Sequence, residues 1–460
     1  MKAEKKASTI KILKISFFAF DIFLLGLLAF LVAAYISARN VKNAPLPAPL
    51  TAQEKNFLQT VLDSTYTKER DPLCLRSLPY PAQAPLLDVK AKSAILVDTL
   101  TGSILYEKNA DEEIPPASLT KIVEMYVVLN ECKKKNISLQ SEVPIPEEAL
   151  AENLPTDASR MCLGRGEHVT LEELLLGLAV ASGNDASIAT AKFVSGSMEE
   201  FVKKMNEAVK EAGLTRTHFV ESSGYSEENI TTAREFARFA RHYINTFPES
   251  LEKFHSQKKI VYPQERNFSE AEKKRFKAGE KFSYEQENTN KLLGQLEGCD
   301  GLKTGFINES GYNIAVTAER SGTRFLSVTM GGPGSSTAEG NKWRVADNTV
   351  IVEYAFSTYA DFKSEVSQAV SVPLAGCSQK SVNLVPAFPL NFTAPKGAKL
   401  SVTKKVPEYI FDSVECGKQY GLLAYTSGDR ILFTVPLVAD RSIGSGGIFD
   451  SAVAEILKRM

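Results

Sequence analysis

Two stretches decide the fold, GYNIAVTAER (residues 311–320) and TRFLSVTMGG (323–332), which are apolar runs joined by Ser321-Gly322. Runs of this kind about a turn dipeptide predict a β-hairpin. The earlier segment SAILVDTLTGSILY (93–106) predicts another hairpin, about a Thr-Gly turn. Between them, helical periodicity recurs in residues 119–130, 171–180, 198–212 and 232–245. Strands at both ends with helices between predict an α+β domain with an antiparallel sheet.

The chain of 460 residues is longer than one compact core usually holds, and its character changes along its length. A helix predicted near 348–358 closes the α+β domain, which we place at residues 86–358. Short alternating strands follow, with a clear hairpin about Ser427-Gly428-Asp429, so residues 359–442 predict a small all-β sandwich domain. Residues 37–85 carry seven prolines and predict a stem. The C-terminal tail, 443–460, fits a short amphipathic helix, a frayed end or a partner contact.

The N-terminus carries the one clear targeting feature. Residues 15–36 are apolar except for Ser16 and Asp21, and about 22 such residues suffice to span a bilayer. Five lysines precede this run in residues 1–14, the predicted cytoplasmic tail, whereas only Arg39 and Lys42 follow closely. This asymmetry places the bulk of the chain outside the cytoplasm. We therefore predict a transmembrane anchor, with a cleaved signal peptide as the alternative.

Composition excludes several classes of function. A net charge of −1, with 43% hydrophobic and 24% charged residues, gives no reason to expect nucleic acid as a partner. The six cysteines include no CxxC pair and the four histidines form no HExxH motif. We therefore expect no metal site and no cofactor. Disulfide connectivity stays open at this point, because six cysteines allow about 15 pairings.

Three short motifs carry the candidate chemistry. Ser118-Leu119-Thr120-Lys121 opens a predicted helix, so Ser118 and Lys121 lie one turn apart on the same face, with Ser118 near the positive helix end. A lysine can accept the serine proton only if burial or neighbouring cations lower its pKa. Ser182-Gly183-Asn184 follows the helix predicted at 171–180, and Lys303-Thr304-Gly305 precedes the hairpin at 311–332.

Order and spacing select this set from its decoys. Lys303-Thr304-Gly305 is unique in the chain, and the second S-x-N, Ser381-Val382-Asn383, lies on the wrong side of it. Several other serines stand three residues before a lysine, namely Ser8, Ser250, Ser256 and Ser401. Only one combination therefore runs in the order S-x-x-K, S-x-N and K-T-G.

This ordered set resembles that of the penicillin-binding proteins and serine β-lactamases. Further runs narrow the resemblance to the low-molecular-weight D-alanyl-D-alanine carboxypeptidases, serine peptidase family S11: ASGNDASIA, GLTRTHF, NTNKLL, CDGLKTG and GYNIAV. The likeness covers residues 89–356 and implies a penicillin-binding/β-lactamase-like transpeptidase domain, and the β-domain resembles the family's C-terminal domain more loosely. The chain departs from the family in its N-terminal anchor and in a charged stretch at 261–287, which we expect to be a solvated insertion.

The resemblance implies a role for each candidate residue. Ser118 would be the acylated nucleophile, Lys121 its proton acceptor, and Ser182 the group that passes a proton to the leaving amine. The substrate would be held by the Asn184 amide, by Lys303 and Thr304 at its terminal carboxylate, and by an oxyanion hole formed from the backbone N–H groups of Ser118 and of Phe306, which follows Gly305. Arg344 would be a second carboxylate contact or an ordinary surface arginine.

The expected reaction is removal of the terminal D-alanine from peptidoglycan stem pentapeptides, with β-lactams as covalent inhibitors. The resemblance also implies a bacterial cytoplasmic membrane enzyme whose catalytic domain lies outside the cytoplasm. A serine β-lactamase is an alternative, but no Glu-x-x-Leu-Asn signature occurs between Ser182 and Lys303. A D,D-endopeptidase of the same fold stays open. A catalytically silent peptidoglycan-binding protein is disfavoured by the intact motifs, and a Cys–His peptidase at Cys162 by the lack of a well-placed histidine.

Overall fold

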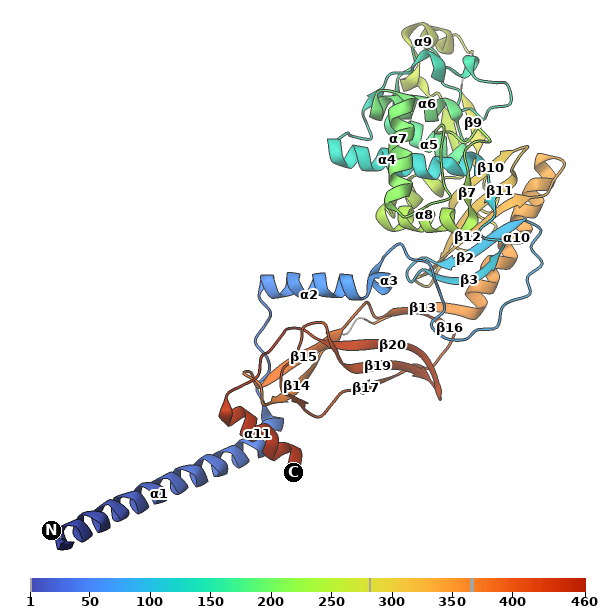
Figure 1. The fold of residues 1–460 in the computed structure, drawn as a ribbon. Coiled ribbons are helices and arrows are strands. Elements are labelled where there is room, and N and C mark those ends of the chain that lie inside the picture. The colour runs from blue at the N-terminus through green and yellow to red at the C-terminus, as the bar shows by residue number, and fades with distance from the viewer. Residues whose placement is uncertain (1, 281–282, 365–367) are drawn as a thin grey trace. The chain divides into compact units, whose positions relative to one another are not determined.

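The computed structural model describes residues 2–280, 283–364 and 368–460 (Figure 1). Within these residues the chain forms two compact units. One, the α+β unit, comprises Pro72–Phe362 and Asn391–Ala398. The other, the β-rich unit, comprises the chain up to Asp71 together with Lys363–Leu390 and Lys399–Met460. Met1, in the predicted cytoplasmic tail, lies outside the described residues, and the predicted domain boundaries stay predictions.

The α+β unit is built on a six-stranded sheet in the order β1-β3-β2-β12-β11-β10. Both predicted hairpins form, β2/β3 and β11/β12, and they pair with each other through β2 and β12. The pairs are antiparallel except for the short parallel contact of β1 with β3. One edge of this sheet is β10, which carries the K-T-G motif. The strands are β1 (Arg76–Ser77), β2 (Ser93–Asp98), β3 (Ser103–Lys108), β10 (Cys299–Ile307), β11 (Gly311–Arg320) and β12 (Thr323–Gly332).

Helices cover both faces of this sheet, as the two-residue alternation of strand side chains requires. On β2, Ile95 and Val97 join the core formed with α4 and α8, whereas Ala94 and Leu96 join the core formed with α10. Figure 1 shows α10 along one side of the sheet and the other helices gathered beyond its opposite side. The helices are α4 (Thr120–Lys135), α5 (Leu171–Val180), α6 (Asn184–Ser195), α7 (Met198–Glu211), α8 (Ala233–Thr246) and α10 (Thr337–Thr358).

The predicted helices form, and their ends follow from capping residues. Thr170 caps α5 through a reciprocal pair of bonds with Glu173, and Ser336 caps α10 by accepting from the backbone N–H of Glu339. This cap explains why α10 begins well before residue 348. Helix α6 was not predicted separately, because only a short turn separates it from α5. Short pairs complete the unit, β4 (Glu113–Ile114) with β7 (Thr231–Thr232) and β5 (Glu142–Val143) with β6 (Val169–Thr170).

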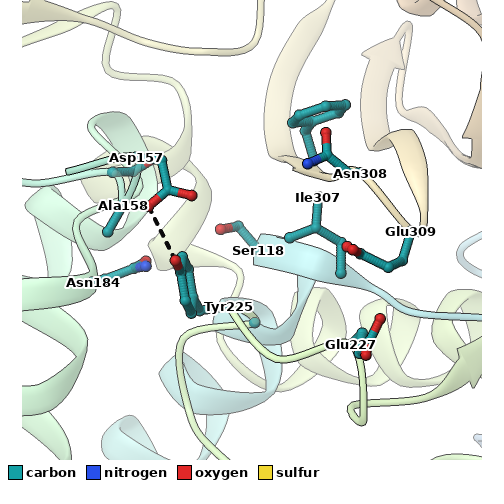
Figure 2. A pocket seen from close by; sticks show the side chains of 12 residues that line it. Ser118, Asp157, Ala158, Asn184, Tyr225, Glu227, Ile307, Asn308 and Glu309 are labelled. Atoms are coloured by element: carbon teal, nitrogen blue, oxygen red, sulfur yellow. Dashed lines mark hydrogen bonds between the residues drawn. The ribbon is translucent and has the colours of Figure 1, made fainter. Parts of the chain in front are cut away.

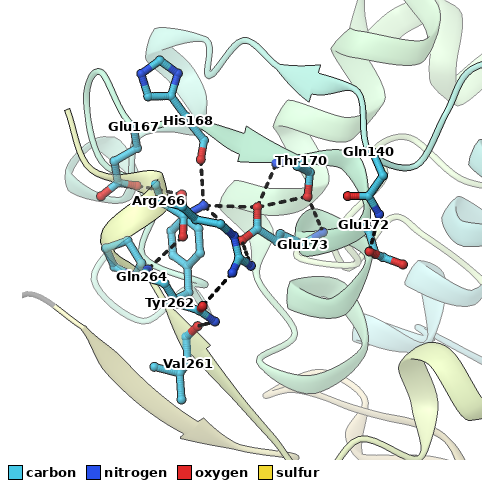
Figure 3. Close-up of polar contacts among 12 residues, drawn as sticks. Gln140, Glu167, His168, Thr170, Glu172, Glu173, Val261, Tyr262, Gln264 and Arg266 are labelled. Atoms are coloured by element: carbon cyan, nitrogen blue, oxygen red, sulfur yellow. Dashed lines mark hydrogen bonds and ion pairs between the residues drawn. The ribbon is translucent and has the colours of Figure 1, made fainter. Parts of the chain in front are cut away.

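The charged insertion is more ordered than a solvated loop. Strands β8 (Lys259–Tyr262) and β9 (Tyr284–Glu287) pair with each other, and α9 (Glu270–Lys277) lies between them in the chain. Figure 3 shows how the segment after β8 binds at the start of α5. Arg266 forms an ion pair with Glu173 at 2.6 Å, and Asn267 donates to Glu173 and to the carbonyl of His168 at 3.0 and 2.7 Å. Residues 281–282 lie outside the described part.

The β-rich unit contains a second six-stranded sheet, in the order β17-β19-β20-β15-β14-β18. The predicted hairpin about Ser427-Gly428-Asp429 is β19/β20. The strands are β14 (Val370–Ala375), β15 (Ser381–Pro386), β17 (Ser401–Lys405), β18 (Ile410–Phe411), β19 (Gln419–Ser427) and β20 (Arg430–Ala439). The fold is therefore α+β followed by a β-rich domain, as predicted.

One strand from the β-region joins the α+β unit instead. Strand β16 (Asn391–Pro395) pairs with β13 (Tyr359–Lys363). Thr393 on β16 donates to the buried Asp98 carboxylate at 2.6 Å and shares a hydrogen bond with Thr101 at 2.7 Å. Burial raises the pKa of Asp98 to about 6. These buried polar contacts explain why β16 belongs with β2, although its neighbours in sequence belong to the β-rich unit.

The predicted anchor lies in α1 (Lys2–Arg39). Within the described residues, Ser8–Arg39 is the one helical stretch long and apolar enough to cross a membrane. Its C-terminal end packs against α11 (Ile448–Arg459), where Ala34 and Ala38 contact Val453. Residues 448–459 of the C-terminal tail are thus helical and in contact with the predicted anchor.

The Pro-rich stretch 37–85, which we predict to be a stem, is partly helical and makes hydrogen bonds within the β-rich unit. It contains α2 (Ala52–Thr65) and α3 (Thr67–Arg70), and its carbonyl groups at Pro45 and Ala48 accept hydrogen bonds from Ser381 and Arg441. Further along, β1 joins the sheet of the α+β unit. Proline keeps this stretch out of long regular elements, but its unpaired carbonyls still find partners on the folded units.

We predict that deleting residues 1–40 leaves catalysis intact, because all three motifs lie in the α+β unit and α1 lies in the β-rich unit. The fragment should move from the membrane fraction to the soluble fraction and still react with a fluorescent penicillin at the rate of the full chain in detergent. A folded fragment that does not react would show that the anchor helix contributes to the active site.

Candidate active site

The Ser118 hydroxyl and the Lys121 amine lie together at the start of α4. Lys121 Nζ is 3.1 Å from Ser118 Oγ, and it also donates to Asn184 Oδ1 at 2.8 Å and to the carbonyl of Ser223 at 2.6 Å. The lysine is fully buried. Burial lowers its pKa to about 8, against the opposing effect of nearby carboxylates. The arrangement therefore places a readily deprotonated amine against the serine hydroxyl.

Ser182 and Lys303 form a second contact across the same site. Ser182 lies in the turn between α5 and α6 with a φ of 58°, and its hydroxyl accepts from Lys303 Nζ at 3.0 Å. The next residue on β10, Thr304, donates its hydroxyl hydrogen bond to Thr289 at 2.7 Å. Burial, together with the charges of Lys121 and Arg344, lowers the pKa of Lys303 well below its ordinary value. The structure thus brings the side chains of all three motifs together.

Two glycines let neighbouring backbone approach the nucleophile. A Cβ atom at Gly305 would lie 2.7 Å from the carbonyl oxygen of Pro116 and 3.0 Å from the amide nitrogen of Ser118. A Cβ at Gly224 would lie 1.9 Å from the carbonyl oxygen of Ala117, and Gly224 also has a φ of 81°. Any other residue at either position would push its strand or loop away from Ser118. The glycine of K-T-G therefore sets how closely β10 meets the nucleophile.

Arg344 is buried, with 8% of its surface exposed, so the alternative of an ordinary surface arginine does not hold. Its guanidinium donates to the carbonyl of Gly305 and to Asn341, and it lies over the ring of Tyr312, 4.9 Å from the ring centroid. Phe306 stacks on the same ring, with centroids 4.3 Å apart. Arg344 thus braces the end of β10 beside Thr304.

Two carboxylates that the motif analysis missed shape the surroundings. Asp185 accepts hydrogen bonds from the backbone N–H groups of Met161, Cys162 and Leu163 at 2.7, 2.7 and 3.0 Å. Glu221 accepts from the backbone of Ser223 and Gly224 at 2.6 and 2.7 Å, which fixes the carbonyl that Lys121 contacts. Asp185 stands inside the ASGNDASIA run and could have been noticed there. Glu221 has no local signature, because only the folded loop shows its role.

Ser118 opens onto a cleft along β10. Figure 2 shows its hydroxyl between Asp157 and Tyr225 on one side and Ile307 to Glu309 on the other, with Tyr225 donating to Asp157 at 3.0 Å. A second hollow continues from Ser118 past Ser182, Thr304 and Arg344. These two hollows leave room for an extended chain beside Ser118 along the edge strand β10.

Burial raises the pKa of the Cys162 thiol, which opposes thiolate formation, and no described cysteine forms a disulfide. In the described ranges no group of histidine, cysteine, aspartate and glutamate side chains is arranged to hold a metal ion.

Comparison with known proteins agrees with this geometry. Residues 80–334 match the profile of the D-alanyl-D-alanine carboxypeptidase family, peptidase S11. The chain is 32% identical over 365 residues to D-alanyl-D-alanine carboxypeptidase DacF of Bacillus subtilis, covering 78% of this chain and 87% of the relative. The DacA protein of Haemophilus influenzae is 30% identical over 370 residues, with shares of 78% and 87%.

A solved structure shows the same architecture. Penicillin binding protein 5 from Haemophilus influenzae superposes with a TM-score of 0.66 at 27% identity, over 79% of this chain and 100% of that one. The serine, lysine and K-T-G arrangement on this fold defines a serine-type acyl-transfer enzyme of the penicillin-binding class. The chain belongs to the D-alanyl-D-alanine carboxypeptidase family, and it is a serine-type hydrolase of that family.

We predict that acylation of the protein accelerates as the pH rises through a range near pH 8. Lys121 can accept the Ser118 proton only when it is unprotonated, and its pKa is lowered from 10.5 to about 8. At lower pH the rate should fall with the fraction of Lys121 that is unprotonated. Single-turnover labelling with a fluorescent penicillin, alongside thermal unfolding at each pH, would measure this. A limb centred near the ordinary lysine pKa would contradict the base role of Lys121.

Proposed function

We propose that this chain removes the terminal D-alanine from peptidoglycan stem pentapeptides through an acyl-enzyme on Ser118. The observation that supports this most is the 3.1 Å contact between Ser118 Oγ and the buried Lys121 amine, in an enzyme of the D-alanyl-D-alanine carboxypeptidase family. A hydroxyl with an ordinary pKa is a weak nucleophile, and a neighbouring unprotonated amine supplies the base that it needs.

In the acylation step, Ser118 Oγ attacks the carbonyl carbon of the scissile bond while its proton passes to Lys121. The negative charge on the carbonyl oxygen would be held by the backbone N–H groups of Ser118 and Phe306. The carbon–nitrogen bond then breaks as Ser182 passes a proton to the leaving amine and regains one from the Lys121 ammonium, and D-alanine departs. Water attacks the remaining ester in the second step and restores the Ser118 hydroxyl.

The substrate carboxylate would bind at the end of the cleft that contains Lys303, Thr304 and Arg344. A cation beside a hydroxyl suits a carboxylate, and the buried guanidinium of Arg344 adds positive potential behind Gly305. Asn184, held by its hydrogen bond to Lys121, would orient the peptide amide. These contacts favour a peptide with a free C-terminus over an internal segment of a chain.

The proposed setting is the bacterial cytoplasmic membrane, with α1 as a single-pass anchor and the catalytic unit outside the cytoplasm. The apolar helix at Ser8–Arg39 and the lysines that precede residue 15 support this orientation. Peptidoglycan stem peptides would be the natural substrate there. β-Lactams, which imitate the terminal dipeptide, would acylate the same serine.

We predict that Ser118 alone receives the acyl group. Mass spectrometry of a penicillin-treated digest should find the adduct on the peptide that contains Ser118 and on none of the peptides with Ser8, Ser250, Ser256 or Ser401. Ser118→Ala should abolish labelling and shift the melting temperature little, because the partly buried hydroxyl makes few contacts. An adduct on any other peptide would overturn the motif assignment.

We also predict that the enzyme turns over peptide faster than penicillin. A β-lactam acyl-enzyme keeps its leaving group tethered, so its hydrolysis needs a dedicated base such as the glutamate of class A β-lactamases. D-Alanine leaves, which makes room for water beside Ser118. Lack of an activated base costs about two to four orders of magnitude in rate, so the penicilloyl adduct should last for minutes or longer.

Intact-mass measurements on stopped samples, with D-alanine release from a pentapeptide assayed in parallel, would test this. A short-lived adduct together with no release of D-alanine would place the protein among the β-lactamases.

A further inference from the structure

A second titratable group is buried in α4 one turn beyond the lysine of the active site. Glu124 stands three residues after Lys121, so both side chains project from the same face of the helix. Both are fully buried, at 0% exposure. A buried carboxyl group is uncommon in a helix core and is costly when ionised and unpaired. The S-x-x-K motif does not include a carboxyl group at this position.

Few protein groups stabilise an ionised Glu124 carboxylate, and the charge of Lys121 contributes more than the nearby Ser187 hydroxyl. Neither of its oxygens has a hydrogen-bond partner among the described residues. Ser187 on α6 is a neighbour, but its hydroxyl shares a 2.7 Å hydrogen bond with Ser222. Burial raises the pKa of Glu124 to about 8, although the charge of Lys121 opposes this. An anion at this position therefore depends on Lys121 for its stabilisation.

Other charged groups near the pair are held by their own partners. Asp185 on α6 and Glu221 in the loop before Ser222 raise the pKa of Lys121, and each accepts several hydrogen bonds elsewhere. Across the site, Lys303 faces Lys121 and binds Ser182. The helices packed on α4 engage their charged or titratable groups away from the pair: Glu173 with Thr170, Lys204 with Glu131, Arg241 with the carbonyl of Thr99, and His242 with Tyr126.

We propose that Glu124 is a positioning residue that acts through Lys121 and governs how readily this lysine gives up its proton. The proposal rests on the role of Lys121 as the base for Ser118. Two coupled groups in one dry site lose their protons as a pair. At low pH the pair is an ammonium beside a neutral carboxyl group. Loss of one proton leaves either a free amine beside a carboxyl group or an ammonium beside a carboxylate.

Only the form with the free amine can accept the Ser118 proton. The alternative form, in which Glu124 is ionised, holds Lys121 as a cation, because opposite charges in a dry site stabilise each other. The free amine therefore accumulates in two stages as pH rises, and its full population is reached only when the second proton leaves. Glu124 thus broadens the pH range over which activity develops and moves the midpoint upward.

The test is the pH dependence of single-turnover acylation by a fluorescent penicillin in Glu124→Gln, which imitates the protonated carboxyl group in size and shape. We expect the wild-type acid limb to be shallower than a one-proton curve. In the variant it should become a one-proton curve with its midpoint about one pH unit lower. Glu124→Asp, which keeps the carboxyl group, should retain the broad limb.

Glu131→Gln is the matched control, because it makes the same change on the same helix. Glu131 is also buried, but it pairs with Lys135 and Lys204 at 2.8 and 3.1 Å and is more than two turns beyond Lys121. Loss of the Glu131 carboxylate should lower the stability of the fold and leave the midpoint of the acylation pH profile unchanged. A midpoint that moves equally in both variants would overturn the proposal.

Further outcomes separate this proposal from the proposed reaction. If the limbs of wild type and Glu124→Gln superimpose, Glu124 is only a core side chain and the proposal is wrong, while the base role of Lys121 stands. If Lys121→Gln is acylated as fast as wild type, the base assignment itself fails. If Glu124→Gln does not fold, the pH profile of wild-type acylation tests the proposal instead. A strict one-proton curve in the wild type would contradict a coupled pair.

Discussion

The Lys121 side chain ties together three segments that are distant in sequence. From the start of α4 it reaches the Ser118 hydroxyl, the Asn184 amide at the start of α6, and the carbonyl of Ser223 in a loop. Because the amine is fully buried, each of these acceptors would be left without its donor if the lysine were lost. An unsatisfied buried polar group costs about 1–3 kcal/mol. The same side chain therefore holds the site in shape and supplies its base, and its environment has to serve both purposes.

The sheet of the α+β unit positions β10, with the K-T-G motif, next to Lys121. Strand β10 lies at the edge of the sheet, so one side of its backbone is open for a peptide, and Gly305 lets it pass close to Ser118. Asn313 on the adjacent strand donates to the carbonyl of Pro115 at 2.9 Å, and so connects the sheet to the turn that precedes the nucleophile. Packing of α8 and α10 on opposite faces holds that edge in position relative to α4.

Much of the fold and of the active site could be predicted from the sequence, because the patterns that indicate them are local. Hairpins at 93–106 and 311–332, the amphipathic helices and the three motifs all depend on patterns within a short window. The supporting groups could not be predicted in this way. Gly224 and Thr289 act through contacts outside their own loops, and Glu221 acts within its loop, where no motif marks its role. Arg344 looked like a possible surface residue because one helix position in isolation does not reveal what packs over it.

Long-range hydrogen bonds add detail that the predicted domain organisation does not contain. The prolines of residues 37–85 indicate a stem, and hydrogen bonds from Ser381 and Arg441 hold part of this stretch on the β-rich unit. Strand β16 follows the partners of Thr393 rather than its neighbours in sequence. In both cases a few buried or partly buried hydrogen bonds join residues that are distant in sequence. A local sequence pattern does not record such partners.

The stack of Phe306, Tyr312 and Arg344 has an evolutionary consequence. One tyrosine ring contacts both an exposed phenylalanine and a buried guanidinium, and Gly340 on α10 leaves room for the ring, because a Cβ there would lie 2.3 Å from it. Tyr312 is the one residue that contacts the other three, so a change of its ring would alter the support of the exposed Phe306 and of the buried Arg344 together. Substitutions at this end of the cleft are therefore expected to be coupled through Tyr312.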